Sequence, residues 1–115
     1  MRNTRPISWV RAALKDFQKF PQPVRLQIET ALTIAAEGQK ADVAKPWKGL
    51  GSGVMEISVA YQTDAYRTIY VTEVAGSLWV VHAFKKKSKK GRATPKQEVD
   101  LIADRVKRLR KELTQ

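Results

Sequence analysis

The stretch VMEISVAYQTDAYRTIYVTEVAGSLWVVHAF, from Val54 to Phe84, decides the fold. Its first part alternates apolar and polar residues, which is typical of a strand with one buried face. The later parts, Tyr66 to Thr72 and Leu78 to Phe84, are rich in aromatic and β-branched side chains that favour strands. Short turn candidates at residues 62–64 and 75–77 separate the three parts. The stretch therefore predicts three consecutive strands in an antiparallel meander.

Two helices are expected before this meander. Ile7 to Val10 is a candidate for a short strand, and apolar residues then recur at helical spacing from Ala13 to Phe17, where the Phe20-Pro21 break follows. A second helix is expected after Pro23, with Gly38 as its end signal. Its apolar stripe consists of Val24, Ile28, Ala31, Leu32 and Ala35. Residues 39–53, rich in Lys, Pro, Gly and Ser, predict an irregular connection that contains Trp47 and Lys48.

A third helix is expected after the meander. Thr94-Pro95-Lys96-Gln97 has the form of a capping box with proline at the first helical position. The apolar residues of this helix step by three and four: Val99, Ile102, Val106, Leu109 and Leu113. The sequence thus predicts an α+β fold, with N-terminal helices and a C-terminal helix packed on a small antiparallel sheet, in a single domain that spans residues 1–115.

The charge of the chain points to a polyanionic partner. The formal net charge is +11, and more than half of the 22 basic side chains lie between Lys85 and Lys111. Such a concentration attracts phosphates and releases counterions on contact, so nucleic acid is the leading partner. A solvated basic face is the plainer alternative. An anionic membrane surface is a third, although the basic helix lacks a bulky aromatic face that would insert.

The composition also limits the reactions that the chain could catalyse. The chain has no cysteine and one histidine, His82, so we expect neither a metal site nor a cofactor. No long apolar segment follows the charged N-terminus, which predicts a soluble, cytoplasmic protein without a membrane span. The polar groups around the strands suit metal-independent RNA cleavage, in which the ribose 2′-OH attacks the adjacent phosphorus. DNA lacks this hydroxyl.

Four residues are candidates for that reaction, and each also has a structural interpretation. Arg67 and Lys86 suit the charge on the phosphate, while Glu56 and His82 suit proton transfer. Alternatively, Arg67 pairs with Glu56 across two strands, and His82 is a satisfied core histidine. We expect the aromatic residues of the meander to serve mainly in packing: Tyr66, Tyr70 and Trp79. The parity of the side chains stays open, because one residue more or less in the turn at 62–64 reverses the face.

The chain resembles the RelE/HigB superfamily of toxin ribonucleases, especially its phage-derived HigB-like branch. The resemblance runs from about Ile7 to Leu109. It rests on these motifs: Phe20-Pro21, Gly53-Val54-Met55-Glu56-Ile57, Tyr66-Arg67, and Val81-His82-Ala83-Phe84 followed by Lys86-Lys87-Ser88 and by Lys90 ahead of Thr94-Pro95. It implies a RelE-like fold, cleavage of messenger RNA on the translating ribosome, and neutralisation by a cognate helix-turn-helix antitoxin of the HigA type.

The resemblance also assigns roles to residues. Arg67 matches the arginine expected to hold the scissile phosphate, and Lys86 belongs to the basic cluster after the last strand. The residues expected to bind messenger or ribosomal RNA are Lys48, Lys85, Lys87, Lys89, Lys90 and Arg92. Two features depart from the family pattern: Ser58 stands where the branch commonly has arginine, and the basic loop is longer by about the three residues 91–93.

Two other functions fit the same features. A toxin of the related ParE type would act on DNA gyrase through protein contacts and without catalysis, on a shared fold. A basic nucleic-acid-binding module would bind through the lysine cluster and perform no chemistry.

Overall fold

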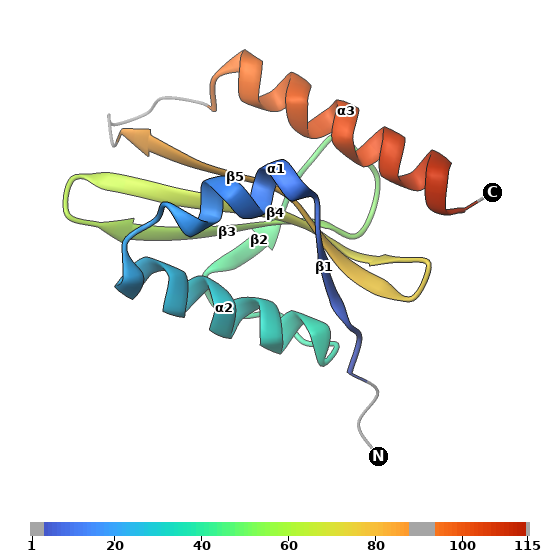
Figure 1. Cartoon of the computed structure of the whole chain (residues 1–115), viewed down its shortest axis with the longest axis horizontal. Helices are drawn as coiled ribbons and strands as arrows, with labels where there is room; N and C mark the ends of the chain where they lie inside the picture. The colour runs from blue at the N-terminus through green and yellow to red at the C-terminus, as the bar shows by residue number, and fades with distance from the viewer. Residues whose placement is uncertain (1–3, 88–93, 115) are drawn as a thin grey trace.

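The computed structural model describes residues 4–87 and 94–114, and it has eight elements (Figure 1). In chain order these are β1 (Ile7–Trp9), α1 (Arg11–Gln18), α2 (Gln22–Ala36), β2 (Ala44–Pro46), β3 (Val54–Tyr61), β4 (Asp64–Val74), β5 (Ser77–Lys87) and α3 (Lys96–Leu113). The α+β class and the order of helices around the meander are as the sequence predicted. None of the described helices is long and apolar enough to cross a membrane.

The five strands form one mixed sheet in the order β1-β5-β4-β3-β2. Strands β3, β4 and β5 make the expected antiparallel meander, and β1 pairs with β5 in parallel. The irregular connection predicted for residues 39–53 is wrong in part, because β2 lies within it and pairs with residues 55–57 of β3. Strand β5 is also longer than predicted. It continues to Lys87, so the first three lysines of the basic run belong to the sheet and not to a loop.

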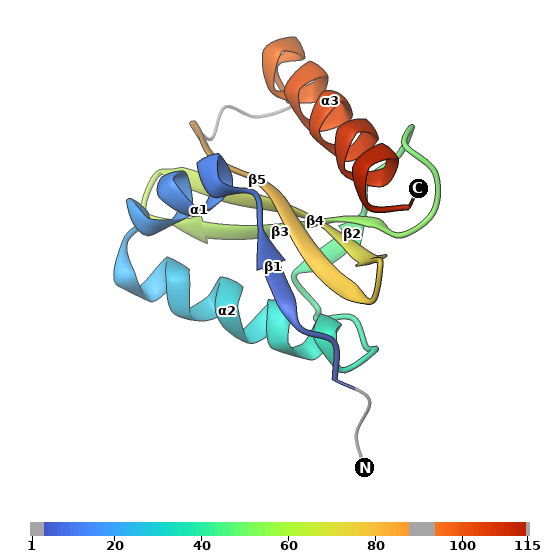
Figure 2. The same ribbon diagram turned by 45° about the vertical axis from the view of Figure 1, so that its right-hand side comes forward.

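The helices cover the two faces of the sheet. Helices α1 and α2 pack on one face and α3 on the other (Figure 2). The expected apolar stripe of α2 is fully buried in the core between α1, α2 and the sheet. In α3 the prediction fails at both ends: Val99 and Leu113 are each 37% exposed, whereas Ile102, Val106 and Leu109 are buried. These two residues lie in the first and last turns of α3, outside the buried stretch from Ile102 to Leu109.

The predicted capping box at the start of α3 is absent. The helix begins at Lys96, with Pro95 in the N-cap position and no side-chain hydrogen bond to the first turn. Thr94 therefore lies one residue too early to act as the cap. Glu98 in the first turn still places a negative charge near the positive end of the helix dipole.

A β-bulge changes the side-chain parity of β5. Ile69 pairs with His82, but the next residue, Tyr70, pairs with Val80, so Val81 is an extra residue in β5. Val81 packs in the core under α3, and His82 also contacts α3. The bulge thus turns both residues toward α3, where strict alternation would have separated them.

Candidate RNA-binding site

The centre of the site is an ion pair between adjacent strands. Glu56 on β3 is 2% exposed, and its Oε2 accepts a hydrogen bond from Nη1 of Arg67 on β4 at 2.7 Å. The Nζ atom of Lys45 on β2 lies 3.6 Å from Oε1 of the same carboxylate. A buried carboxylate without partners would be costly, so these two cations are what allows Glu56 to lie inside the sheet. The pairing of Arg67 with Glu56, which the sequence left open, is present.

A cleft of about 490 Å³ opens over this pair. It collects side chains from the four strands β2 to β5, from the connection that follows β2, and from the segment before α3. The lining residues are Lys45, Pro46, Trp47, Lys48, Glu56, Arg67, Lys86 and Thr94. Four cations thus face one carboxylate in a single cleft, and this arrangement suits a phosphate group.

Lys86 lies on β5, next to the strand that carries Arg67. Its pKa lies below the ordinary lysine value, chiefly because the ammonium is partly desolvated, and further because of Arg67 and Lys45. Glu56 acts in the opposite direction and raises it. Lys86 therefore releases its proton more easily than an ordinary lysine.

Arg67 has a donor to spare. Its Nε atom is buried and has no hydrogen-bond partner among the described residues, while Nη1 is engaged by Glu56. A buried donor without an acceptor is destabilising, and guanidinium groups bind phosphate through two parallel N–H donors. The arginine is thus oriented by Glu56, and its Nε–H is a donor that no described residue uses.

The other predicted RNA-binding residues do not all lie in the cleft. Lys48 lines the cleft. Lys85 and Lys87 alternate with Lys86 along β5 and so face the opposite side of the sheet, with Lys85 Nζ 3.8 Å from an Asp64 carboxylate oxygen. The remaining predicted residues lie outside the described part of the chain: Lys89, Lys90 and Arg92.

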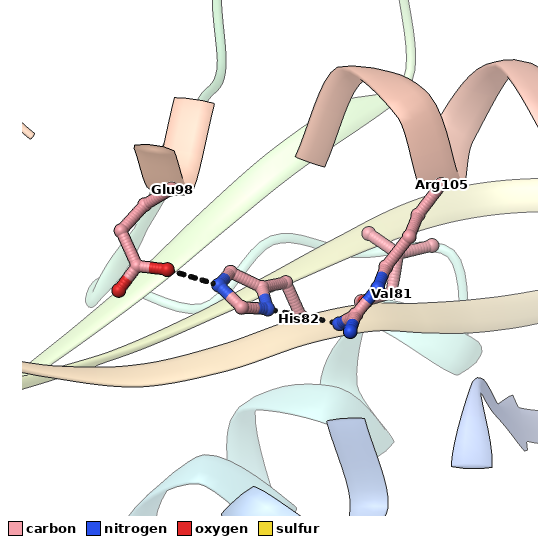
Figure 3. Close-up of polar contacts among 4 residues, drawn as sticks. All are labelled: Val81, His82, Glu98 and Arg105. Atoms are coloured by element: carbon pink, nitrogen blue, oxygen red, sulfur yellow. Dashed lines mark hydrogen bonds and ion pairs between the residues drawn. The ribbon is translucent and has the colours of Figure 1, made fainter. Parts of the chain in front are cut away.

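His82 lies in a polar network under α3 (Figure 3), and it does not line the cleft. Its Nε2 is 2.8 Å from Oε1 of Glu98, and its Nδ1 is 3.0 Å from Nη1 of Arg105, which also donates to the carbonyl of Val81 at 3.0 Å. Because arginine can only donate, Nδ1 accepts and Nε2 carries the proton that is donated to Glu98. The 3% exposed ring also stacks on Phe84, so His82 has the contacts of a satisfied core histidine.

A second cleft, of about 390 Å³, adjoins His82. Its lining residues are Asp16, Lys19, Phe20, Tyr66, His82, Ala83, Phe84, Lys85 and Glu98. The structure thus brings together three of the four predicted catalytic residues, Glu56, Arg67 and Lys86, and it places His82 elsewhere.

The chain matches a family model over most of its length. The model is described as phage-derived protein Gp49-like, and the match covers residues 15–107. The chain belongs to this family. The Gp49-like family is one of RelE/HigB-like toxins, so the resemblance seen in the sequence is confirmed at the level of the family. No curated protein sequence matches the chain significantly.

Solved structures of RelE share the fold of this Gp49-like chain. A double arginine-to-alanine mutant of the E. coli toxin RelE in the free state superposes with a TM-score of 0.62 at 18% identity, over 91% of this chain and 97% of that one. The isolated E. coli RelE toxin superposes with a TM-score of 0.57 at 21% identity, over 91% and 98% of the two chains. At these identities the likeness establishes a RelE-like fold.

Sequence reasoning missed several residues of the two sites. Lys45 and Trp47 lie in the stretch that was predicted to be irregular, although their closeness to Lys48 was a signal. Glu98 and Arg105 of α3 were not among the predicted site residues, yet both contact the ring of His82. Their spacing of seven residues puts them on one side of the helix, and this was the available signal.

Two further observations concern metal binding and the aromatic residues of the meander. Within residues 4–87 and 94–114 no group of three or more His, Asp or Glu side chains could hold a metal ion. Tyr66 and Tyr70 are buried in the core under α1 and α2, as predicted, and Trp79 packs against the core under α3. Desolvation raises the pKa of Tyr70, so its hydroxyl stays protonated in the fold.

Proposed function

We propose that this chain is the toxin of a type II toxin–antitoxin system, and that it inhibits translation by cutting messenger RNA on the ribosome without a metal ion. The main support is the cleft in which Arg67 and Lys86 meet from adjacent strands, with Lys45 and Lys48 beside them. Cations at these positions suit the extra negative charge that a phosphodiester gains in its transition state. Membership of a family of RelE/HigB-like toxins supports the same function.

The proposed reaction uses the RNA's own 2′-hydroxyl. The 2′-oxygen attacks the adjacent phosphorus while the bond to the 5′-oxygen breaks, which leaves a 2′,3′-cyclic phosphate and a 5′-hydroxyl. Glu56 accepts the proton of the 2′-hydroxyl, and Arg67 stabilises the charge on the phosphorane-like transition state. Lys86 shares that role and gives a proton to the departing 5′-oxygen. Its lowered pKa suits a donor, because proton transfer is most efficient when the pKa approaches the working pH.

The role of His82 in proton transfer stays a prediction. Both ring nitrogens are engaged, one by Glu98 and one by Arg105, so the ring would have to give up a hydrogen bond to take part. The oxygens of Glu56 are engaged as well, by Arg67 and Lys45. We assign proton transfer to Glu56 and Lys86 in preference because both line the cleft with Arg67, which His82 does not.

The partners follow from the proposed activity. A family of toxins implies an antitoxin, and we propose that it is a helix-turn-helix protein of the HigA type. A ribosomal target implies a cytoplasmic site of action. The exposed lysines Lys48, Lys85 and Lys87 are proposed to bind messenger or ribosomal RNA, together with Lys89, Lys90 and Arg92 of the same basic run.

Mapping RNA 5′-ends in cells that express the protein tests the activity. We expect new ends within translated messages for the wild type, and none when translation initiation is blocked. Arg67→Ala should lower the cleavage rate by on the order of a hundredfold, the usual effect of losing one transition-state contact. Lys111→Ala removes an exposed cation of α3 and is the matched control, which should cut as the wild type does.

A fold control is needed because Arg67 also balances the buried Glu56. Arg67→Lys keeps a cation at this place but loses the planar fork, so it should remain folded, by circular dichroism, and still cut slowly. Growth arrest with intact messages would contradict the nuclease. If an SOS response accompanied that arrest, it would point to a gyrase poison, and toxicity unaffected by Arg67→Ala would point to a binding module.

A further inference from the structure

Trp47 holds a fixed position at the wall of the RNA cleft. It directly follows β2, and its backbone N–H donates to the carbonyl of Val54 at 2.8 Å, which ties it to the first residue of β3. The indole is partly buried. It packs against the core under α3 and also lines the cleft that contains Arg67 and Lys86.

Packing on the core does not by itself explain why Trp47 also lines the cleft. Trp79 is also partly buried against the same core, and it does not line the cleft. Among the described residues that line the cleft, Trp47 is the only aromatic one, and Lys45 and Lys48 flank it in the chain. An indole between cations is the usual composition of a surface that binds single-stranded nucleic acid, since the cations hold the backbone and the ring stacks on a base.

We propose that Trp47 is a base-stacking subsite for single-stranded RNA, and that it receives the base of a nucleotide adjoining the phosphate held by Arg67. This inference rests on the proposed function. It adds a contact that the phosphate-binding cations cannot supply, because phosphate contacts carry no information about the base. Stacking accepts every base, so we expect purines to bind better than pyrimidines without strict sequence selection.

Binding of a trinucleotide that cannot be cut provides the test. The probe has 2′-O-methyl riboses, which lack the attacking hydroxyl, and a matched probe has an abasic central residue. We expect the wild type to bind the complete probe about tenfold more tightly than the abasic one, which is within the range of base stacking on aromatic side chains. The indole N–H signal of Trp47 in a nitrogen–proton NMR spectrum should shift with the complete probe, and that of Trp79 should not.

Substituted proteins show whether the preference for the complete probe comes from Trp47, and whether it can be lost without losing the fold or the proposed nuclease activity. Trp47→Leu keeps an apolar side chain on the core and should bind both probes equally, whereas Trp47→Phe should retain most of the preference. Trp79→Leu is the matched control and should keep the full preference. A preference for the complete probe that survives in Trp47→Leu would overturn the subsite while leaving the nuclease intact. Binding of both probes that does not depend on Arg67 would overturn the proposed function itself, and the subsite with it.

Discussion

At the scale of single residues, the site is governed by one buried carboxylate. Glu56 fixes one side of the Arg67 guanidinium, and the same group lies close enough to influence the pKa of Lys86. The two cations therefore compete for the charge of Glu56, while each also disfavours the positive charge of the other. The pKa of Lys86 is lowered chiefly by desolvation, and Arg67 and Glu56 shift it further in opposite directions.

The pKa of Lys86 should respond to its two neighbours in opposite directions. Arg67→Gln removes a positive charge and should raise the pKa of Lys86, and Glu56→Gln removes the negative charge and should lower it further. Titration of the Lys86 side-chain carbon signal by NMR measures both shifts. Equal pKa values in wild type and both variants would show that desolvation alone sets the value. Lys111→Gln, on the exposed surface of α3, is the control and should leave it unchanged.

The same residues show what the sequence can predict. Arg67 and Glu56 were identified as candidates, but whether they face each other depends on the number of residues in the turn between β3 and β4. The structure has a two-residue loop there, with Tyr61 paired to Asp64 and Gln62 at a positive φ of 55°. For His82 the deciding feature is the extra Val81, and no residue type in the sequence signals that bulge.

At the scale of elements, the connection from β2 to β3 is shaped by Gly53. Its φ is +88°, and a Cβ built there would lie 2.9 Å from Oγ1 of Thr72 on β4. The Gly53 carbonyl also accepts a hydrogen bond from the Thr72 N–H at 2.8 Å, so the two backbones cannot separate easily. This contact sets the start of β3 and with it the position of Val54, to which Trp47 is bonded.

Gly53→Ala should therefore destabilise the fold by about 2 kcal/mol or more, since it combines left-handed strain with a steric clash. Gly49→Ala is the matched control, because Gly49 has a φ of +98° but no atom within 4 Å of the added Cβ. It should cost only the strain, about 1 kcal/mol. Urea denaturation measures both. Thr72→Ala removes the clashing oxygen and should recover part of the loss in a Gly53→Ala background; equal costs for the two glycines would contradict the clash.

The elements differ in how well sequence predicts them. The meander was predictable because β-branched and aromatic residues fill each strand over a sufficient length. Strand β2 has only three residues, including a lysine and a proline, and it exists because its backbone pairs with β3. Strand β5 extends through Lys85 to Lys87 for the same reason: pairing with residues 64–66 of β4 outweighs the low strand propensity of lysine.

At the scale of the molecule, alternation along β5 distributes the basic run over two faces. Lys86 turns toward the cleft and α3, whereas Lys85 turns toward the face that α1 and α2 cover. The lysines at the end of β5 thus do not form one patch. Local cations of the cleft should hold a short RNA, and the remainder should attract it at longer range.

The salt dependence of binding distinguishes these contributions. The molecule extends over 40 × 31 × 23 Å, so a trinucleotide in the cleft cannot cover all of its cations. Each phosphate contact contributes about 0.7 to the slope of log affinity against log salt for single strands. A trinucleotide has two internal phosphates, and Arg67 is proposed to hold one of them. Lys45→Gln with Lys48→Gln should therefore reduce the slope for the 2′-O-methyl trinucleotide by about 0.7, the contribution of the other phosphate. Lys107→Gln with Lys111→Gln removes the same charge from the exposed side of α3 and should leave the slope unchanged. Equal reductions by the two pairs would show that net charge, and not the cleft, binds the RNA.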